Sequence, residues 1–305
     1  MPPPFDASDV EKAGCGGPGR RSPPYDIIRP ARQTVPFVFA SPHSGRDYPA
    51  DFVRAARLDP TTLRSSEDAF VDELFAAVPG LGAVLLRARF PRAYVDVNRE
   101  PLELDPDMFE DALPAAANTR SARVSAGLGT IARIVANGEE IYAGKLLYAE
   151  AARRIERFYR PYHQALSGLI AETRRTFGFA VLIDCHSMPS IGGPLDADPG
   201  LHRFDIILGD CHGVACAPAL SEMAGTLLQR QGFAVRYNNP YAGGFTTRHY
   251  GRPAEHCHAL QIELNRALYM DETMIAPNRD FARIADAMTA FAARLVHTAP
   301  ARLAA

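Results

Sequence analysis

Short apolar runs alternate with longer amphipathic stretches along this chain from residue 35 onward. The apolar runs predict strands over residues 35–40, 83–88, 94–97, 179–184, 204–208, 233–237 and 258–264. The amphipathic stretches predict helices over residues 67–78, 142–176, 217–231 and 280–296. Pro161 is expected to kink or divide the second of these helices. Alternating strands and helices are typical of an α/β fold, with a mainly parallel sheet covered by helices on both faces.

Two segments lack this periodicity. Residues 1–34 are rich in Pro, Gly and Arg, which predicts a flexible N-terminal arm. Residues 100–140 mix Asp, Pro, Ala and Gly, which favours loops and short helices that cover a site. Because neither an internal repeat nor a clear linker follows the arm, residues 35–300 are interpreted as a single domain.

Composition argues against several classes of protein. The 305 residues are 47% hydrophobic and carry a formal net charge of −2, which gives no basis for binding nucleic acid or an anionic membrane. No apolar run approaches the ~18 residues of a membrane span. The first residues lack the apolar stretch of a signal peptide, so we expect a cytoplasmic protein. The five cysteines include no CxxC pair and predict neither a disulfide framework nor a thiolate zinc site. The sequence makes no prediction of oligomeric state.

Two of the apolar runs end in a histidine. The segment "VPFVFASPHSG" (35–45) delivers His43, and "VLIDCHSMPS" (181–190) delivers His186. If the two strands are parallel neighbours, both imidazoles reach the edge of the sheet where ligands bind in folds of this kind.

A carboxylate is available to join these histidines. The segment "SSEDAFVDELF" (65–75) places Glu67, Asp68 and Asp72 at the start of a predicted helix. Two imidazoles and a carboxylate make a three-ligand zinc site with an open fourth position, which is the catalytic form. Acidic residues also favour helix starts without any metal, so the segment alone is compatible with simple capping.

Another carboxylate interrupts the last predicted strand, in "HALQIELNRALYMDE" (258–272). Its alternation sets the leucines and the isoleucine on one face, and Gln261 and Glu263 on the other. A carboxylate in the middle of such a strand is costly unless it is paired or functional. Glu263 is therefore interpreted either as a general base acting on a metal-activated water or as an ion-pair partner of Arg266 or another arginine.

Eight segments together resemble the N-formylglutamate amidohydrolase family. They run in the family's order over nearly all of residues 36–290: "SPHSGRDYP" (41–49), "EDAFVDEL" (67–74), "RAYVDVNR" (92–99), "RPYHQAL" (160–166), "LIDCHSMPS" (182–190), "DIILGDCHG" (205–213), "NNPYAGGFTTRHYG" (238–251) and "HALQIELNRALYMDE" (258–272). The resemblance implies a three-layer α/β/α core around a mixed sheet, similar to that of zinc carboxypeptidases. It also implies metal-dependent cleavage of the formamide of N-formyl-L-glutamate to formate and glutamate, the last step of one route of histidine degradation in many bacteria.

The resemblance assigns roles to residues of these segments. His43, an acid of "EDAFVD" and His186 would hold the zinc ion, with Asp68 favoured as the acid and Glu67 as the alternative. Sites with two imidazoles and one carboxylate also accept Mn, Fe or Co. Glu263 would be the catalytic carboxylate, which takes a proton from water and passes it to the leaving nitrogen.

Further side chains are candidates for the remaining tasks. Arg92, His249 and His258 are candidates to stabilise the tetrahedral intermediate, with Arg92 and His258 preferred. Asp184, two residues before His186, is a candidate hydrogen-bond partner of a metal ligand.

The implied substrate is a small N-formyl amino acid with two carboxylates. Its site needs cationic anchors, and the fork of an arginine suits a carboxylate best. Arg99 and Arg248 are the candidates among the arginines of the matching segments. Asn98 and Arg99 form a pair similar to that with which zinc carboxypeptidases hold a terminal carboxylate. In "PYAGGF", Tyr241 and Gly244 are candidates because glycine lets backbone approach a ligand closely.

Other functions are compatible with part of this pattern. A zinc peptidase or cell-wall amidase, or an amidohydrolase acting on another N-acyl amino acid, would use the same catalytic residues. A non-catalytic protein that binds an acidic ligand is disfavoured because His43, His186 and Glu263 are all present. Cys185 adjoins His186, but neighbours in a strand point to opposite faces, so we do not expect cysteine catalysis.

Overall fold

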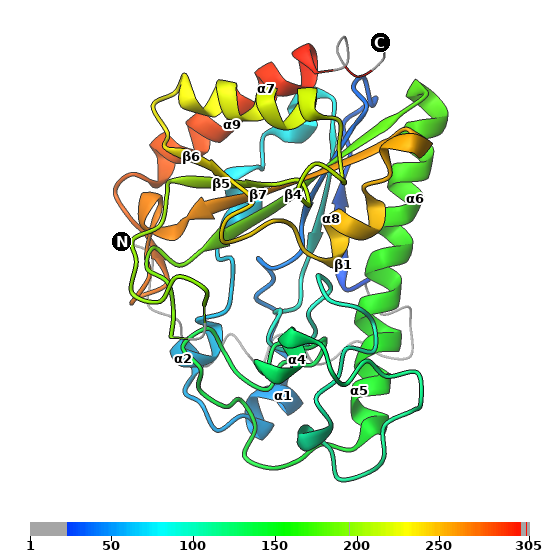
Figure 1. Ribbon diagram of the computed structural model, residues 1–305, viewed down its shortest axis with the longest axis vertical. Coiled ribbons are helices and arrows are strands. Elements are labelled where there is room, and N and C mark those ends of the chain that lie inside the picture. Colours follow the sequence, from blue (N-terminus) through cyan, green and yellow to red (C-terminus); the bar gives the residue numbers. More distant parts are fainter. Residues whose placement is uncertain (1–22, 195, 300–302, 304–305) are drawn as a thin grey trace.

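The structure, a computed structural model of the 305-residue chain, describes residues 23–194, 196–299 and 303. A seven-stranded sheet crosses the molecule in the order β1-β3-β2-β4-β7-β5-β6 (Figure 1). Its strands are β1 (Tyr25–Ile28), β2 (Phe37–Ser41), β3 (Val84–Ala88), β4 (Ala180–Met188), β5 (Ile206–Gly209), β6 (Val235–Tyr237) and β7 (Cys257–Asn265). The pairings among β3, β2, β4 and β7 are parallel, as is that of β5 with β6. β1 and β5 pair antiparallel with β3 and β7, so the expected mixed, mainly parallel sheet is confirmed.

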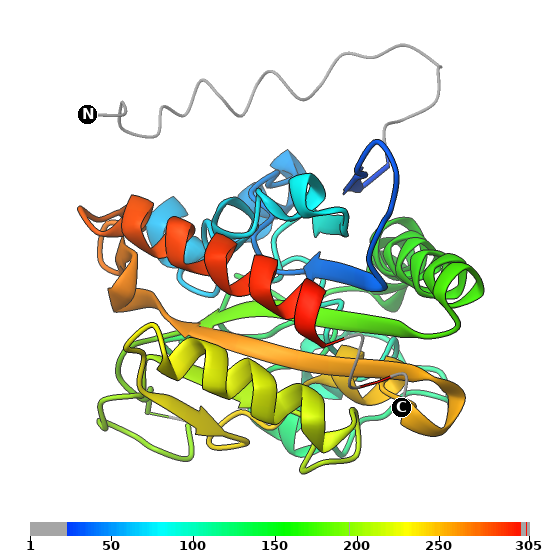
Figure 2. The same ribbon diagram turned by 90° about the horizontal axis from the view of Figure 1, so that it is seen from above.

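Helices cover both faces of this sheet. On one face lie α3 (Val71–Leu74), α7 (Pro218–Gln229) and α9 (Phe281–Thr298), with α7 and α9 side by side (Figure 2). On the other face lie α6 (Arg160–Phe177) and α8 (Phe245–Tyr250). The three-layer α/β/α architecture expected from the sequence is confirmed. No helix of the described residues is both long and apolar enough to cross a membrane.

Shorter elements lie beyond and between these layers. The remaining helices are α1 (Ala50–Ala55), α2 (Pro60–Arg64), α4 (Ala122–Ser125) and α5 (Tyr148–Arg154), which lie below the sheet in Figure 1. The 3₁₀ turns are Val78–Leu81, Pro106–Met108, Pro253–Glu255 and Arg266–Leu268, and a small second sheet joins β8 (Met270–Asp271) to β9 (Ala276–Pro277). Residues 100–140 form mostly loops with short helical turns, as the sequence predicts.

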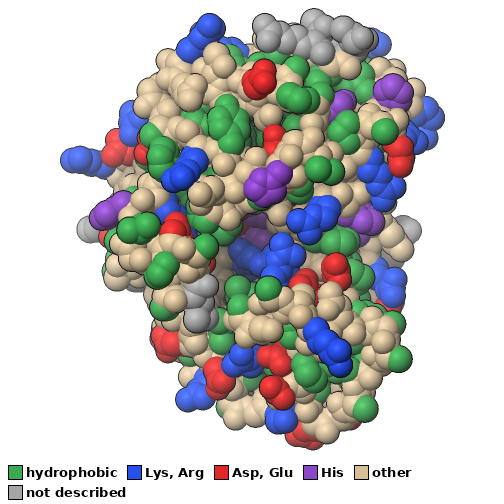
Figure 3. Space-filling view, in the orientation of Figure 1, with side chains coloured by type: hydrophobic (Ala, Val, Ile, Leu, Met, Phe, Trp, Pro, Cys, Tyr) green, Lys and Arg blue, Asp and Glu red, His purple; other side chains and the backbone are tan. Residues whose placement is uncertain are grey.

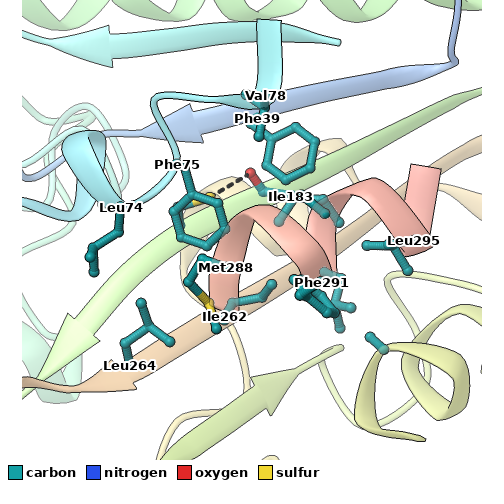
Figure 4. Packing of buried hydrophobic residues seen from close by; sticks show 14 of the residues in the cluster. Phe39, Leu74, Phe75, Val78, Ile183, Ile262, Leu264, Met288, Phe291 and Leu295 are labelled. Carbon is teal, nitrogen blue, oxygen red and sulfur yellow. Dashed lines mark hydrogen bonds between the residues drawn. The ribbon is translucent and has the colours of Figure 1, made fainter. Parts of the chain in front are cut away.

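The sheet divides the hydrophobic core in two. Phe39 and Ile183 point towards α9, where they pack with Phe291 in the first cluster (Figure 4). Residues of the opposite parity, such as Leu182, point to the other face and pack with Leu166 of α6. Because successive side chains in a strand alternate between the faces, this arrangement also determines which polar side chains share a face.

One predicted strand is wrong. Residues 94–97 form a turn in which the N–H groups of Tyr94 and Val95 both bond to the carbonyl of Pro91, at 3.0 and 3.3 Å. The apolar side chains that suggested a strand are nevertheless buried, because the turn packs into the second core cluster.

The predicted helix over residues 67–78 is also largely wrong. Only Val71–Leu74 are α-helical, and Phe70 before them has a left-handed φ of 65°. The backbone N–H of Asp68 bonds to the carbonyl of His43 at 3.1 Å. Asp68 therefore lies in a turn that is attached to the loop after β2, and not within a helix.

The long helical region is divided close to Pro161. A π-helical turn (Ile155–Tyr159) joins α5 to α6, and Pro161 follows in the first turn of α6. Because proline lacks the N–H that a continuing helix needs, the hydrogen-bond pattern changes here, and the π-helical turn just before Pro161 accommodates that change.

The predicted N-terminal arm needs a correction at its end. Residues 1–22 lie outside the described part of the chain, but Tyr25–Ile28 form edge strand β1. Asp26 in this strand pairs with Arg87 of β3 at 3.0 Å. A four-residue strand beside prolines gives too weak an alternation to be recognised from the sequence.

Candidate active site

The two histidines predicted to meet do so. β2 pairs in parallel with β4, so the loop after β2 and the end of β4 lie at the same edge of the sheet. The ring centroids of His43 and His186 are 4.8 Å apart, and both residues are buried. β4 also pairs in parallel with β7, which sets Glu263 directly opposite His186.

Asp68 completes a buried group of three candidate ligands. Its Oδ2 lies 3.3 Å from Nδ1 of His43 and 2.9 Å from Nδ1 of His186. The candidate ligand atoms of the three residues all lie within 4.8 Å of one another. Burial alone would raise the pKa of Asp68, but the two imidazoles and Arg92 outweigh it and hold that pKa well below its usual range.

The neighbouring acid, Glu67, is engaged elsewhere. Its carboxylate accepts hydrogen bonds from Nε and Nη2 of Arg64, both at 3.0 Å, and from the hydroxyl of Tyr48 at 2.7 Å. The choice between Glu67 and Asp68 that the sequence left open therefore falls on Asp68 as the acid that joins the histidines.

Carboxylates behind the histidines orient both rings. Nε2 of His43 lies 2.8 Å from Oδ1 of Asp96. Nε2 of His186 lies 3.1 Å from Oδ1 of Asp184, but the two atoms are not aligned for a hydrogen bond. The same Nε2 lies 3.2 Å from Nδ2 of Asn98. With Nε2 occupied on each ring, the two Nδ1 atoms face Asp68. This donor set fits a divalent transition metal, whose histidine ligands usually bond to a carboxylate through the other nitrogen.

Glu263 lies in a polar setting on the same face of the sheet. Nε2 of Gln261 donates to its Oε1 at 2.6 Å, and the N–H of Gly244 donates to Oε1 of Gln261 at 2.8 Å. Burial raises the pKa of Glu263 to about 8, against the opposing charges of His186 and Arg92.

These residues open into one cavity of about 340 Å³. Figure 3 shows the hollow near the middle of this face, with Lys or Arg side chains and His side chains at its walls. Its lining includes His43, His186, Glu263 and the arginines Arg92, Arg99, Arg123 and Arg266.

Two of these arginines pair with Asp68, the carboxylate of the ligand group. Nη2 of Arg92 lies 2.8 Å from Asp96, and its Nη1 lies 3.7 Å from Asp68. Nη2 of Arg266 lies 3.1 Å from Oδ1 of Asp68, which leaves Oδ2 of that carboxylate for the histidines. Arg266 therefore pairs with Asp68 and not with Glu263, the partner considered from the sequence.

Four of the predicted substrate-binding residues line the cavity: Asn98, Arg99, Tyr241 and Gly244. Nε of Arg99 donates to the carbonyl of Leu128 at 2.9 Å. The side chain of Asn98 is already committed, because its Oδ1 accepts the N–H of Thr246 at 2.8 Å while its Nδ2 meets His186. A Cβ at Gly244 would lie 2.2 Å from Nδ2 of Asn98, so this close approach of backbone and amide requires glycine.

Two of the predicted site residues, Arg248 and His258, lie elsewhere. Arg248 is exposed on α8, beside Cys211, and does not line the cavity. His258 lies near the amino end of β7, five residues or roughly 16 Å along the strand from Glu263. Its parity turns it to the other face of the sheet, where Nδ1 accepts the N–H of Ala217 at 3.2 Å. His249, the other histidine considered, is also exposed and absent from the lining.

Cys185 behaves as its position in β4 predicts. The thiol is buried in the first core cluster, on the face opposite His186, and burial raises its pKa well above the usual range. A buried protonated thiol directed away from the cavity is not a nucleophile for this site.

Sequence reasoning missed three contributors to the site. The sequence predicts a strand around Asp96 that does not form, although the acid stands in "RAYVDVNR". The sequence predicts the correct face for Gln261 but indicates no role for it. Arg123 comes from the stretch with the weakest sequence pattern, which offered no signal for it.

The fold and the site define an α/β protein with a candidate three-ligand metal site at the carboxyl edge of a mixed sheet. The family model described as N-formylglutamate amidohydrolase matches residues 35–270. The chain belongs to the N-formylglutamate amidohydrolase family.

Two curated relatives support this family membership. The chain is 32% identical over 242 residues to N-formylglutamate deformylase of Pseudomonas putida. The aligned region covers 78% of this chain and 83% of that protein. It is 30% identical over 251 residues to N-formylglutamate deformylase of Pseudomonas aeruginosa, with 81% and 86% covered.

Solved structures resemble the fold as well. The crystal structure of N-formylglutamate amidohydrolase from Ralstonia eutropha JMP134 superposes with a TM-score of 0.81 at 37% identity, over 90% of this chain and 97% of that one. The gene product Atu2144 from Agrobacterium tumefaciens shares the fold at 17% identity, with a TM-score of 0.65 over 91% and 95% of the two chains.

Proposed function

We propose that this protein hydrolyses the formamide bond of N-formyl-L-glutamate to formate and L-glutamate. The observation that carries the proposal is the group of His43, Asp68 and His186, with Glu263 opposite His186, in one arginine-lined cavity. Relatives that carry the name of this activity match along most of the chain and support the choice of substrate.

The metal of this site is proposed to be zinc, held by Nδ1 of His43, Oδ2 of Asp68 and Nδ1 of His186. A bound zinc ion would act as a Lewis acid that lowers the pKa of water and polarises the formyl oxygen. Asp96 and Asp184 keep the two imidazoles oriented, since each meets the ring nitrogen that faces away from Asp68. The same ligand set accepts Mn, Fe or Co, so metal identity is tested together with activity.

Glu263 is proposed to move the proton. Its Oε1 is held by Gln261, and no described residue donates a hydrogen bond to its Oε2. We therefore assign Oε2 as the atom that takes a proton from the attacking water and later gives it to the leaving nitrogen. A carboxylate whose pKa is raised by burial holds that proton more readily than an exposed glutamate does.

Arginines are proposed to meet the negative charges of the reaction. Arg92 lines the cavity beside Asp68 and Asp96, and it is our candidate to stabilise the charge that develops on the formyl oxygen. Arg99 is our candidate for one substrate carboxylate, and the Gly244 backbone and Tyr241 line the same cavity.

The size of the cavity favours a small substrate over a polymer. Its volume of about 340 Å³ is near the lower end of the roughly 300–1,000 Å³ of small-molecule sites. This supports an amino-acid amidohydrolase over a peptidase or a wall amidase.

The test is release of formate from N-formyl-L-glutamate by the purified full-length chain. Activity is measured as purified, after chelation and after zinc is added back, with N-formyl-L-aspartate and N-acetyl-L-glutamate alongside. We expect chelator-sensitive turnover that is restored by zinc and is highest with N-formyl-L-glutamate. Higher turnover of another acyl amino acid would make that compound the proposed substrate. No turnover of any of these compounds by metal-loaded protein would refute the proposed enzymatic activity.

A further inference from the structure

The cavity contains a fourth arginine, Arg123, on a segment outside the sequence motifs. It belongs to α4, whose first turn is capped by Ser121, which accepts the N–H of Val124 at 3.0 Å. The hydroxyl of Ser121 also donates to buried Glu103 at 2.5 Å, which fixes the start of the helix. The backbone that presents Arg123 to the cavity is therefore well anchored.

Arg123 and Arg99 are connected through one short loop. The N–H of Leu128 donates to the carbonyl of Arg123 at 2.8 Å, and the carbonyl of Leu128 accepts Nε of Arg99 at 2.9 Å. Both arginines line the same cavity. The two arginines thus line the cavity from segments that are joined at Leu128.

The four cavity arginines differ in what they contact. Arg92 and Arg266 pair with Asp68, and Arg99 lies 3.8 Å from Asp96. The guanidinium of Arg123 has no hydrogen bond or ion pair with any residue in the described ranges. It is thus the cation of this cavity whose charge the described protein leaves unbalanced.

The proximity of two cations also has an electrostatic cost. Burial, and more weakly the charges of Arg92 and Arg123, lower the pKa of Arg99 to about 10 although Asp96 opposes the shift. Like charges that share a cavity repel one another, and an anion bound against Arg123 would relieve that repulsion.

We propose that Arg123 binds the side-chain carboxylate of an acylated dicarboxylic amino acid and sets the preference of the site for such substrates. This inference rests on the proposed function. In N-formylglutamate the α-carboxylate is attached to the carbon that bears the reacting nitrogen, whereas the side-chain carboxylate lies two methylene groups further away. Arg99 is next to the ligand group through Asp96, while Arg123 contacts no member of it, so Arg123 takes the more distant carboxylate.

The test compares two substrates that differ only in this carboxylate. Formate release from N-formyl-L-glutamate and from N-formyl-L-glutamine is measured with the zinc-loaded wild type, Arg123→Gln, Arg123→Lys and Arg120→Gln. Arg120 is exposed just before α4 and does not line the cavity, so it is the matched control.

We expect Arg123→Gln to raise KM for N-formyl-L-glutamate by about 10- to 100-fold, as for loss of a charged hydrogen bond. KM for N-formyl-L-glutamine should change by less than about 3-fold, Arg123→Lys should recover part of the loss, and Arg120→Gln should match the wild type. Equal changes with both substrates, or no change with either, would overturn the proposal.

A second measurement separates this inference from the proposed function. If the wild type releases formate from neither compound, the proposed reaction fails, and calorimetric binding of N-formyl-L-glutamate and of N-formyl-L-glutamine then decides the role of Arg123. At least tenfold weaker binding to Arg123→Gln of the glutamate compound alone, with Arg120→Gln unaffected, would support the carboxylate site. Equal affinity of wild type and Arg123→Gln for N-formyl-L-glutamate, or no binding of it to the wild type, would overturn the proposed carboxylate site.

Discussion

Glu263 and His186 occupy facing positions in the parallel pairing of β7 with β4. Their side chains point to the same face of the sheet, which places the proposed proton carrier beside a candidate metal ligand. A register shift of one residue would bury Glu263 against α9 and bring an aliphatic side chain to the cavity. The hydrophobic alternation of β7 therefore determines both the core and the catalytic geometry.

The first prediction concerns Glu263→Gln. The amide keeps the shape of the side chain but cannot take up a proton, so kcat should fall by about 10²- to 10⁴-fold. Metal content and melting temperature should stay close to those of the wild type. The measurement is formate release under saturating substrate, and a variant that retains more than a tenth of wild-type kcat would refute the assigned role.

The second prediction distinguishes the two adjacent acids. Asp68→Asn should lose most bound metal because the neutral amide replaces the carboxylate that faces both histidines. Glu67→Gln should keep its metal, since Glu67 bonds to Arg64 and Tyr48, although it should be less stable. Metal per chain, measured by plasma mass spectrometry after dialysis, gives the answer. A metal-free Glu67→Gln beside a metal-loaded Asp68→Asn would reverse the assignment.

The parts of the site on strands were predictable from the sequence. His186 and Glu263 belong to apolar strands that are recognisable from the sequence, and the alternation of side-chain directions along a strand excludes Cys185 from the cavity. The same alternation places His258 on the face opposite Glu263, so that candidate was avoidable.

The parts of the site on turns were less predictable. Asp96 lies in a turn that resembles a strand in its apolar content, and Asp68 lies in a turn before a four-residue helix. Arg123 stands on the short helix α4, whose position depends on tertiary contacts, such as that of Ser121 with Glu103. Local propensity carries no information about such contacts.

A third prediction concerns Gly244, whose Cβ position lies within 2.2 Å of the Asn98 amide. Gly244→Ala should displace Asn98, which contacts His186, and reduce kcat/KM by at least about 10-fold. Overpacking of this kind also lowers the free energy of unfolding by about 1–3 kcal/mol. Gly80→Ala is the matched control, because a Cβ there meets no atom within 4 Å. Equal activity of the two variants would show that the loop adapts to the added methyl group.

The last prediction concerns His163, which supports the turn that carries Asp96 and Asn98. Its Nε2–H donates to the carbonyl of Val97 at 2.8 Å, and its Nδ1 accepts the hydroxyl of Tyr250 at 2.9 Å. Burial lowers the pKa of His163 from the ordinary 6.5 to about 4, against the opposing hydrogen bond to Val97.

This pKa shift gives a pH dependence of known sign. Between pH 6.5 and about 4 the unfolded chain binds a proton at His163 that the folded protein does not. The contribution of His163 to the free energy of unfolding therefore decreases as the pH falls through this range. His163→Gln does not titrate there. The stability difference between wild type and His163→Gln should therefore shrink by up to about 2 kcal/mol from pH 7.5 to pH 5 in urea unfolding. A difference for His163→Gln that is constant or grows towards pH 5 would contradict the neutral, buried imidazole.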